Sequence, residues 1–363
     1  LPISKTTGTY TLFVNNGNGT FREITLLNFG SNPAGGIVTL GDYNNDGFLD
    51  GFIARAGSDY LVQNNGDGTY TDVTATAGVS TSAASVGAIF ADYNKDGFLD
   101  LFVVNSDAPS ILYKNLGTGA FQNVTSAAGI QVNPAVENRA AVFFDAENDG
   151  DLDLYVVNYL SANVLYLNQG NGTFQIAPGA GVSNNGMGRA VAAADYNNDG
   201  FTDLFVVNSV NTAALLYKNN GDGTFSNVTA SAGIPSLGTD PQGAVFADLN
   251  NDGFLDLYVV GNNQNNLFLA NDGAVKFTDK SSAAKLTLPL AACQVAAGDY
   301  NQDGMVDLFV AGNPLMVFRN DSPKTNNFIQ VRTVGTRSNR LGIGARLELL
   351  SDSGRFVRTV KDG

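Results

Sequence analysis

Residues 92–100 read DYNKDGFLD and residues 111–125 read ILYKNLGTGAFQNVT, and together these two stretches form the repeating unit that decides the fold. The acidic nonapeptide occurs six times, and its successive starts are 50 to 53 residues apart. We name the copies acidic loops 1 to 6: residues 42–50, 92–100, 145–153, 195–203, 248–256 and 299–307. A fixed period of about fifty residues is typical of solenoids, propellers and arrays.

A second motif, an Asn-Gly turn such as NNGDGTF, runs out of phase with the acidic loops. It begins at Asn15, Asn64, Asn115, Asn168 and Asn219, with weaker copies at Asn271 and Asn320. Asn-Gly and Asp-Gly pairs supply the positive φ angles of tight hairpins. Apolar stretches flank both motifs, so each repeat reads as two hairpins, or four short strands. Four strands per repeat predict an all-β protein built as a β-propeller of four-stranded blades.

The number of blades depends on both ends of the chain. The chain opens on a half-repeat, residues 10–25, and six complete acidic hairpins follow. We expect residues 328–332 to complete the sixth repeat, and residues 345–350 and 355–360 to form a last hairpin. That hairpin would join the half-repeat in a composite blade and close a seven-bladed propeller. The alternative is six blades plus a separate tail.

Composition excludes several classes of protein. The chain has 363 residues, no His and one Cys, so a His-based triad, a His or Cys zinc site and an internal disulfide are all unavailable. A net charge of −14 without basic patches argues against a nucleic-acid partner. No apolar run approaches the roughly 20 residues of a membrane span.

The acidic loops have the pattern of a calcium site. The spacing Asp-x-Asn-x-Asp-Gly-x-x-Asp places oxygen side chains at positions 1, 3, 5 and 9, and the carbonyl of position 7 can add another oxygen. Ca²⁺ prefers six to eight hard oxygen ligands in a flexible geometry, whereas Mg²⁺ demands a tighter octahedron. We therefore expect up to six Ca²⁺ ions. The predicted ligands are Asp42, Asn44, Asp46, Phe48 and Asp50; Asp92, Asn94, Asp96, Phe98 and Asp100; Asp145, Glu147, Asp149, Asp151 and Asp153; Asp195, Asn197, Asp199, Phe201 and Asp203; Asp248, Asn250, Asp252, Phe254 and Asp256; and Asp299, Asn301, Asp303, Met305 and Asp307.

Two other interpretations of these loops are weaker. Asp, Asn and Gly also form ordinary turns, but six copies with every oxygen position filled favour a metal. A helical calcium hand needs an acidic ligand at position 12, and that position falls on the apolar residues Ile53, Val103 and Val156. The loops are therefore expected in β-hairpin turns.

A partner site is expected on the face opposite the acidic loops. The residues six positions before loops 3, 4 and 5 are Arg139, Arg189 and Gln242. If they face the central channel, the arginines could hold a carboxylate or an acidic sugar; ordinary pairing with Glu137 or solvent is the alternative. Cys293, at the same place before loop 6, is expected to be a buried small residue. No catalytic constellation is recognisable.

These repeats resemble the FG-GAP or VCBS repeats of integrin α-subunit propellers and of many secreted bacterial proteins. Residues 327–346 are similar to the ASPIC/UnbV module, which accompanies such repeats in the cartilage acidic protein 1 family. The resemblance implies a propeller domain over residues 1–326, an ASPIC/UnbV-like segment over residues 327–363, bound calcium and an extracellular, secreted or cell-surface setting.

The favoured function is a calcium-stabilised scaffold that binds or adheres to a protein or glycan. The alternatives are a self-assembling cell-surface or filament subunit and a carbohydrate-active enzyme. Twenty of the 34 acidic residues lie in the six loops, and six Ca²⁺ ions would change the net charge from −14 to about −2. Most of the acidic residues are therefore accounted for by the predicted metal ligands.

Overall fold

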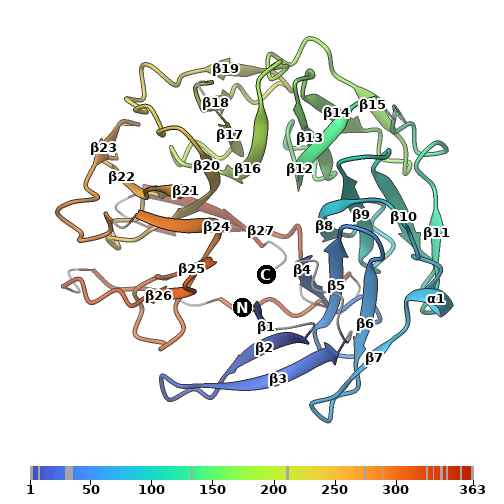
Figure 1. Ribbon diagram of the computed structural model, residues 1–363. Helices are drawn as coiled ribbons and strands as arrows, with labels where there is room; N and C mark the ends of the chain where they lie inside the picture. The colour runs from blue at the N-terminus through green and yellow to red at the C-terminus, as the bar shows by residue number, and fades with distance from the viewer. Residues whose placement is uncertain are drawn as a thin grey trace.

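The computed structural model places seven groups of strands around one central axis, and the chain travels once around it (Figure 1). It describes residues 3–6, 9–28, 36–131, 133, 135–209, 212–273, 275–287, 289–323, 326–329, 331–335, 338–340, 342–351 and 354–360. We number the strand groups blades 1 to 7, starting at residue 36.

Blades 1 to 5 have four antiparallel strands each, with the first strand near the axis and the fourth at the rim (Figure 1). Blade 1 contains β4 (Gly36–Gly41), β5 (Asp50–Arg55), β6 (Tyr60–Asn64) and β7 (Tyr70–Asp72). Blade 2 contains β8 (Ser85–Ala91), β9 (Asp100–Asn105), β10 (Ile111–Asn115) and β11 (Phe121–Asn123). Blade 3 contains β12 (Glu137–Phe144), β13 (Asp153–Tyr159), β14 (Val164–Asn168) and β15 (Phe174–Ile176). Blade 4 contains β16 (Gly188–Ala194), β17 (Asp203–Asn208), β18 (Leu215–Asn219) and β19 (Phe225–Asn227). Blade 5 contains β20 (Pro241–Ala247), β21 (Asp256–Asn265), β22 (Leu267–Asn271) and β23 (Phe277–Asp279).

Blades 6 and 7 have three strands each in the part of the chain that is described. Blade 6 contains β24 (Pro289–Gly298), β25 (Asp307–Asn313) and β26 (Met316–Phe318), and the end of β21 also pairs with β24. Blade 7 contains β1 (Ile3–Thr6), β2 (Thr9–Asn15) and β3 (Phe21–Asn28). The one described helix is the single turn α1 (Thr74–Ala77), which ends at Gly78 in the left-handed conformation that glycine tolerates.

The sequence pattern explains this arrangement. Each acidic loop connects the first two strands of its blade, and each Asn-Gly turn connects the last two in blades 1 to 5. The second strand, for example β9, is buried along its whole length because it lies in the middle of a sheet that is covered on both faces. The core therefore lies between blades, as where Phe102 and Val104 of blade 2 pack with Leu154 and Val156 of blade 3.

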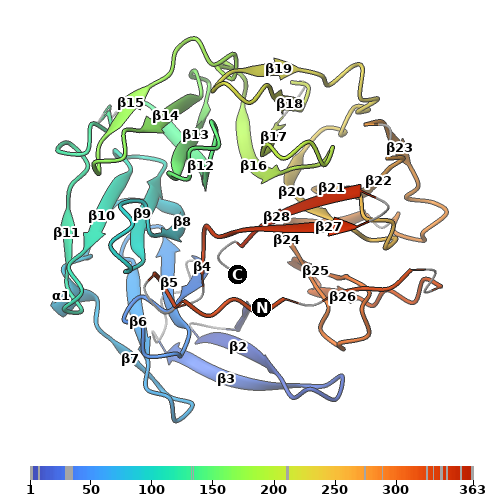
Figure 2. The ribbon, with the colours of Figure 1, turned by 180° about the vertical axis from the view of Figure 1, so that it is seen from behind.

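The seven-bladed all-β fold is confirmed, but the expected composite blade is wrong. The last hairpin does form, from β27 (Arg346–Ser351) and β28 (Gly354–Thr359), yet within the described residues these strands pair only with each other. The hairpin lies across the face of the propeller, in front of β20, β21 and β24 (Figure 2). Its side chains contact the acidic loops, and these contacts hold it away from blade 7.

Residues 328–332 do not complete blade 6 either, because the described ones among them form no strand. Phe328 instead lies against Gly304 of acidic loop 6. We refer to residues 326–360 as the tail; its described residues lie on the acidic-loop face.

Blade 7 closes the propeller onto blade 6 through contacts that recur between other neighbouring blades. The aromatic rings of Phe21 and Tyr300 are 5.5 Å apart, and the equivalent rings of Phe174 and Tyr93 are also 5.5 Å apart. The side-chain amide of Asn15 donates a hydrogen bond to the Tyr300 carbonyl at 2.5 Å. The N-terminal half-repeat thus packs directly against blade 6.

Candidate metal sites and the opposite face

The first Asp of each acidic loop organises the backbone of its loop. In loop 1 the backbone N–H groups of Asp46 and Gly47 donate to the two carboxylate oxygens of Asp42, both at 2.9 Å. The fourth position has a positive φ in all six loops, and so does the glycine at the sixth position. Asn and Gly tolerate this conformation better than other residues, which is why the loops are rich in both.

The ninth Asp is the most buried predicted ligand. Asp50 has no exposed surface, and one of its oxygens accepts a hydrogen bond from the backbone N–H of Asn64 at 2.8 Å. Its other oxygen, Oδ2, is buried without a hydrogen-bond partner, whereas the equivalent oxygen accepts a hydrogen bond in loops 2 to 6. A buried carboxylate oxygen without a partner is costly, and a cation would satisfy it.

Burial and neighbouring charge act together on these ninth-position carboxyls. The pKa of Asp50 is raised to about 7, chiefly by burial and in smaller part by the carboxylates of Asp46 and Asp42. The pKa of Asp100 rises to about 8, and those of Asp153 and Asp256 to about 7, again chiefly through burial. The carboxyls of one loop are therefore difficult to ionise at the same time, because their negative charges repel one another. A bound cation would neutralise this repulsion and favour the ionised forms.

The donor set suits Ca²⁺, although the side chains are engaged with one another in this structure. Hard oxygens occupy every predicted ligand position, but the Asn44 amide donates to Asp46 at 2.8 Å. Among the described residues, no group of three or more Asp, Glu, His or Cys side chains is arranged to hold a metal ion. The residues fit calcium by chemistry, and Asn44 and Asp46 would have to exchange their mutual hydrogen bond for the ion.

The raised pKa values predict an unusual pH dependence for the metal-free chain. A carboxyl whose pKa is higher in the folded state than in the unfolded state stabilises the fold when protonated, and this stability is lost as pH rises through the folded pKa. We expect the melting temperature of metal-free protein to fall between pH 5 and pH 8, in a thermal denaturation series. A melting temperature that rises steadily over this range would contradict the prediction. Because calcium binds the ionised form, its affinity should increase over the same interval.

The residues at the seventh position have a packing role besides the predicted carbonyl ligand. The aromatic rings of Phe48, Phe98, Phe201 and Phe254 lie against the first glycine of the Asn-Gly turn in the same blade. In loop 3 the seventh residue is Asp151, which pairs with Lys95 of loop 2 at 2.6 Å.

In six of the seven Asn-Gly motifs the first Asn connects neighbouring blades, a role that the sequence pattern did not predict. The amide of Asn219 donates to the Thr202 carbonyl of its own acidic loop at 3.0 Å and to the Ala146 carbonyl of loop 3 at 2.8 Å. Six of the motifs reach back to the second residue of the preceding loop in this way, from Asn15, Asn115, Asn168, Asn219, Asn271 and Asn320. Asn64 of blade 1 is the exception, because the blade before it is blade 7, which has no acidic loop whose carbonyl could accept this hydrogen bond.

We expect Asn219→Ala to lower the free energy of unfolding by about 2–4 kcal/mol, because one buried and one half-buried carbonyl group lose their donor. Urea denaturation followed by fluorescence measures this loss. Asn220→Ala is the matched control, since Asn220 is the exposed neighbour in the same turn. Equal losses in the two variants would show that the connection between blades contributes nothing.

The residues predicted for the opposite face occupy one structural position, the bulge in the innermost strand of their blade. The pairing register shifts at Arg139, Arg189 and Gln242, and also at Val86 and Cys293. Bulges re-aim a side chain. Cys293 is exposed, so the expectation that it is buried is wrong; the shift in register turns it out of the sheet.

Acidic partners accompany the bulge residues. Arg139 pairs with Glu137 and lies over the ring of Tyr159, 5.1 Å from its centroid. Arg189 lies 3.8 Å from Asp240, and the Gln242 amide donates to the same carboxylate at 2.5 Å. The two arginines and the two acids carry no net charge. Together they offer a ligand both hydrogen-bond donors and hydrogen-bond acceptors.

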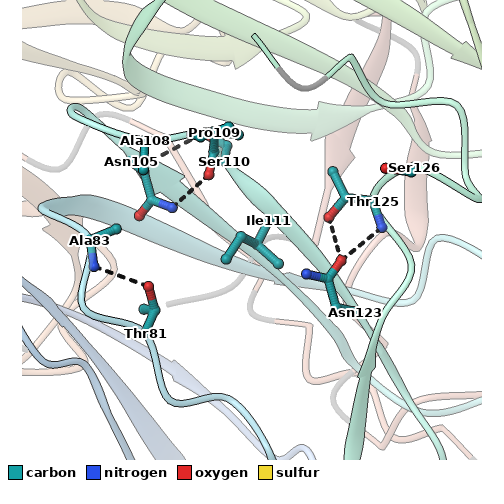
Figure 3. Close-up of a pocket in the computed structure, with 10 residues that line it drawn as sticks. All are labelled: Thr81, Ala83, Asn105, Ala108, Pro109, Ser110, Ile111, Asn123, Thr125 and Ser126. Atoms are coloured by element: carbon teal, nitrogen blue, oxygen red, sulfur yellow. Dashed lines mark hydrogen bonds between the residues drawn. The ribbon is translucent and has the colours of Figure 1, made fainter. Parts of the chain in front are cut away.

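Two hollows lie between residues of blades 1 and 2. The pocket of ≈ 290 Å³ in Figure 3 is lined by polar but uncharged side chains such as Asn105, Ser110 and Thr125, and it has no acid in its described lining. The hollow of ≈ 340 Å³ includes Asp59 and Asp72. Asp59 accepts hydrogen bonds from the Arg55 backbone and the Ser85 hydroxyl, so its oxygens are already engaged in holding the turn.

Comparison with known families identifies the repeat. A family model described as an FG-GAP-like repeat matches residues 3–53, 42–103, 92–156, 145–206, 195–259 and 248–310. The chain belongs to the FG-GAP-like repeat family. The matches to FG-GAP repeats end at residue 310, and the ASPIC/UnbV character of the tail stays a prediction.

Individual proteins resemble this FG-GAP chain in sequence and in fold. Cartilage acidic protein 1 from Homo sapiens is 29% identical over 187 residues, which cover 47% of this chain and 28% of that protein. The alignment thus spans less than a third of the relative. Two solved lectin structures share the fold. The lectin from Agrocybe aegerita, which recognises non-reducing terminal N-acetylglucosamine, has a TM-score of 0.51 and 17% identity, covering 85% of this chain and 88% of its own. BP39L lectin from Burkholderia pseudomallei has a TM-score of 0.54 and 15% identity, covering 86% and 91%.

Proposed function

We propose that this chain is a calcium-stabilised extracellular binding scaffold without catalytic activity. The observation that carries the calcium part is the buried carboxyl at the ninth position of all six loops, which in loop 1 has an oxygen without a hydrogen-bond partner. The resemblance to cartilage acidic protein 1 supports an extracellular setting, where millimolar calcium suits loops of modest affinity. Among the described residues, no helix is long and apolar enough to cross a membrane.

We further propose that the partner, a protein or glycan, binds at the face opposite the acidic loops. The tail covers part of the acidic-loop face, whereas the bulge residues line the other end of the innermost strands. The side chains of Arg139 and Arg189 are 27% and 29% exposed, so each retains atoms that a ligand could reach. Because acids accompany both arginines, a neutral polyhydroxylated sugar or a polar protein loop suits this group better than an acidic sugar.

A glycan array probed with the calcium-loaded chain tests the glycan form of this proposal. We expect binding to at least one neutral glycan and at least about a tenfold loss for Arg139→Gln/Arg189→Gln, since bidentate arginine bonds are strong. Arg22→Gln/Arg319→Gln is the matched control, because both of these side chains are exposed elsewhere. Binding to no sugar would eliminate the lectin form and leave a protein partner as the form to test.

A self-associating subunit is the second candidate, and the tail hairpin favours it. Strands β27 and β28 pair only with each other in the described residues, and unpaired strand edges invite a strand from another molecule. Leu350 on β27 is 71% exposed. Light scattering after gel filtration, with and without chelator, would reveal such assemblies; a monomer at every concentration would eliminate this candidate.

A further inference from the structure

The tail is held on the acidic-loop face by contacts with five of the six loops. At four loops it hydrogen-bonds the side chain at the fourth position. The backbone N–H of Arg340 donates to Asn45 at 3.0 Å, Arg346 Nη1 to Asn148 at 2.8 Å, Arg358 Nη1 to Asn198 at 3.3 Å, and the Asn251 amide to the carbonyl of Asn326 at 3.0 Å.

The tail also contacts the glycine at the sixth position. Arg358 Nη2 donates to the Gly253 carbonyl at 3.1 Å, and the aromatic ring of Phe356 lies against the same glycine. The Arg340 guanidinium lies against Gly47 of loop 1, and Phe328 against Gly304 of loop 6. The fourth and sixth positions are those with positive φ, so the tail recognises the particular backbone conformation of the loops.

Charge complements this fit. The tail, residues 326–360, contains six basic and two acidic side chains, a net charge of +4, whereas the six loops contain twenty acidic residues and one lysine. A loop with three Asp would still carry −1 after binding one Ca²⁺, so the attraction for the tail would keep its sign.

In their hydrogen bonds, the tail and the predicted metal sites use different atoms of the loops, although the Arg358 guanidinium also attracts the first-position carboxylates of Asp195 and Asp248. The predicted ligands are side-chain oxygens at positions 1, 3, 5 and 9 and the carbonyl at position 7. The tail uses position 4 and the backbone at position 6. A metal ion and the tail can therefore occupy one loop together. Two ligands that bind the same conformation through different atoms strengthen each other's binding.

We propose that the tail is a strap whose docking on the acidic loops is coupled to calcium: calcium in the loops tightens the strap, and the docked strap tightens calcium binding. The inference rests on the proposed calcium function. The acidic-loop face is covered when calcium is abundant and becomes accessible when calcium is withdrawn.

Two measurements on the full chain test the coupling, with Ca²⁺ itself as the probe. Hydrogen exchange of residues 342–360 with and without Ca²⁺ reports docking, and calorimetric titration reports calcium affinity. Arg358→Gln removes bonds to loops 4 and 5, and Arg346→Gln independently removes the bond to loop 3. Arg332→Gln is the matched control, since Arg332 is an exposed tail arginine and the charge change is the same.

We expect calcium to slow exchange in the tail of the unaltered chain. Arg358→Gln should weaken calcium binding about fivefold or more, as typical coupling energies imply, while Arg332→Gln changes it less than about twofold. Tail exchange that is the same with and without calcium, in a chain that binds calcium, would overturn the coupling alone. So would calcium that releases the tail, or unchanged calcium affinity in an Arg358→Gln chain whose tail is released. A chain that binds no calcium would overturn both the coupling and the proposed calcium function.

Discussion

Removing calcium is expected to lower the melting temperature of this protein by more than about 10 °C, because each occupied site contributes about 2.7 kcal/mol at a calcium concentration one hundred times its dissociation constant. Six filled sites would contribute about 16 kcal/mol under the same condition. The physical reason lies in the ninth-position carboxyls, which are buried near two further acids in each loop. Differential scanning calorimetry in EGTA, and again after excess Ca²⁺ is restored, measures the effect.

Specific loss of one site provides the control. Asp195→Asn/Asp203→Asn should remove about one sixth of the calcium effect, and Asp67→Asn/Asp222→Asn should leave it intact because those two acids are fully exposed in Asn-Gly turns. Recovery with Mg²⁺ as complete as with Ca²⁺ would contradict the assignment of the metal. An unchanged melting temperature after chelation would contradict the calcium interpretation as a whole.

Among the changes considered, disrupting the contact between blades 6 and 7 is expected to cause the second-largest loss of stability. Asn15→Ala/Phe21→Ala removes the hydrogen bond to Tyr300 and the aromatic contacts of Phe21 with Tyr300 at 5.5 Å and with Phe309 at 6.2 Å. Loss of a packed Phe and a hydrogen bond costs about 3–5 kcal/mol. Urea denaturation should show this loss, and hydrogen exchange should show faster opening of β2 and β3.

Phe121→Ala distinguishes closure from ordinary packing. Phe121 makes the equivalent contact with Tyr43 inside the propeller, with ring centroids 5.6 Å apart. We expect this variant to lose similar stability without selective opening of β2 and β3. Selective opening in both variants, or in neither, would mean that blade 7 is not the closing element.

The repeat unit could be predicted from sequence because its determinants are local. Position 1 of each acidic loop bonds the backbone four and five residues later, and Asn-Gly turns set their own φ angles. Alternating apolar runs on both sides then give hairpins such as β8–β9, and the fixed period gives the propeller. The same local chemistry indicated the predicted ligands and the absence of a helical calcium hand.

The connection between blades was visible only in part. The Asn at the start of each Asn-Gly turn reads as a turn former in sequence, and its own backbone turn uses it in that way. Its second role requires the carbonyl of a residue about 73 positions earlier, as for Asn219 and Ala146. The recurrence of an Asn 13 to 16 residues after the end of every acidic loop is the signal that could have revealed it.

By itself, the sequence determined the blades, the acidic loops and the hairpin at the C-terminal end, since each depends on residues within a few positions of one another. Only the tertiary structure decided where that hairpin goes. Strand pairing with blade 7 and docking on the acidic loops are both compatible with the pattern of residues 346–359. Docking prevails because Arg346 and Arg358 meet fourth-position side chains that are 160 to 198 residues away along the chain. These side chains lie on one face only after the propeller has formed, so no local sequence pattern predicts that they are close together.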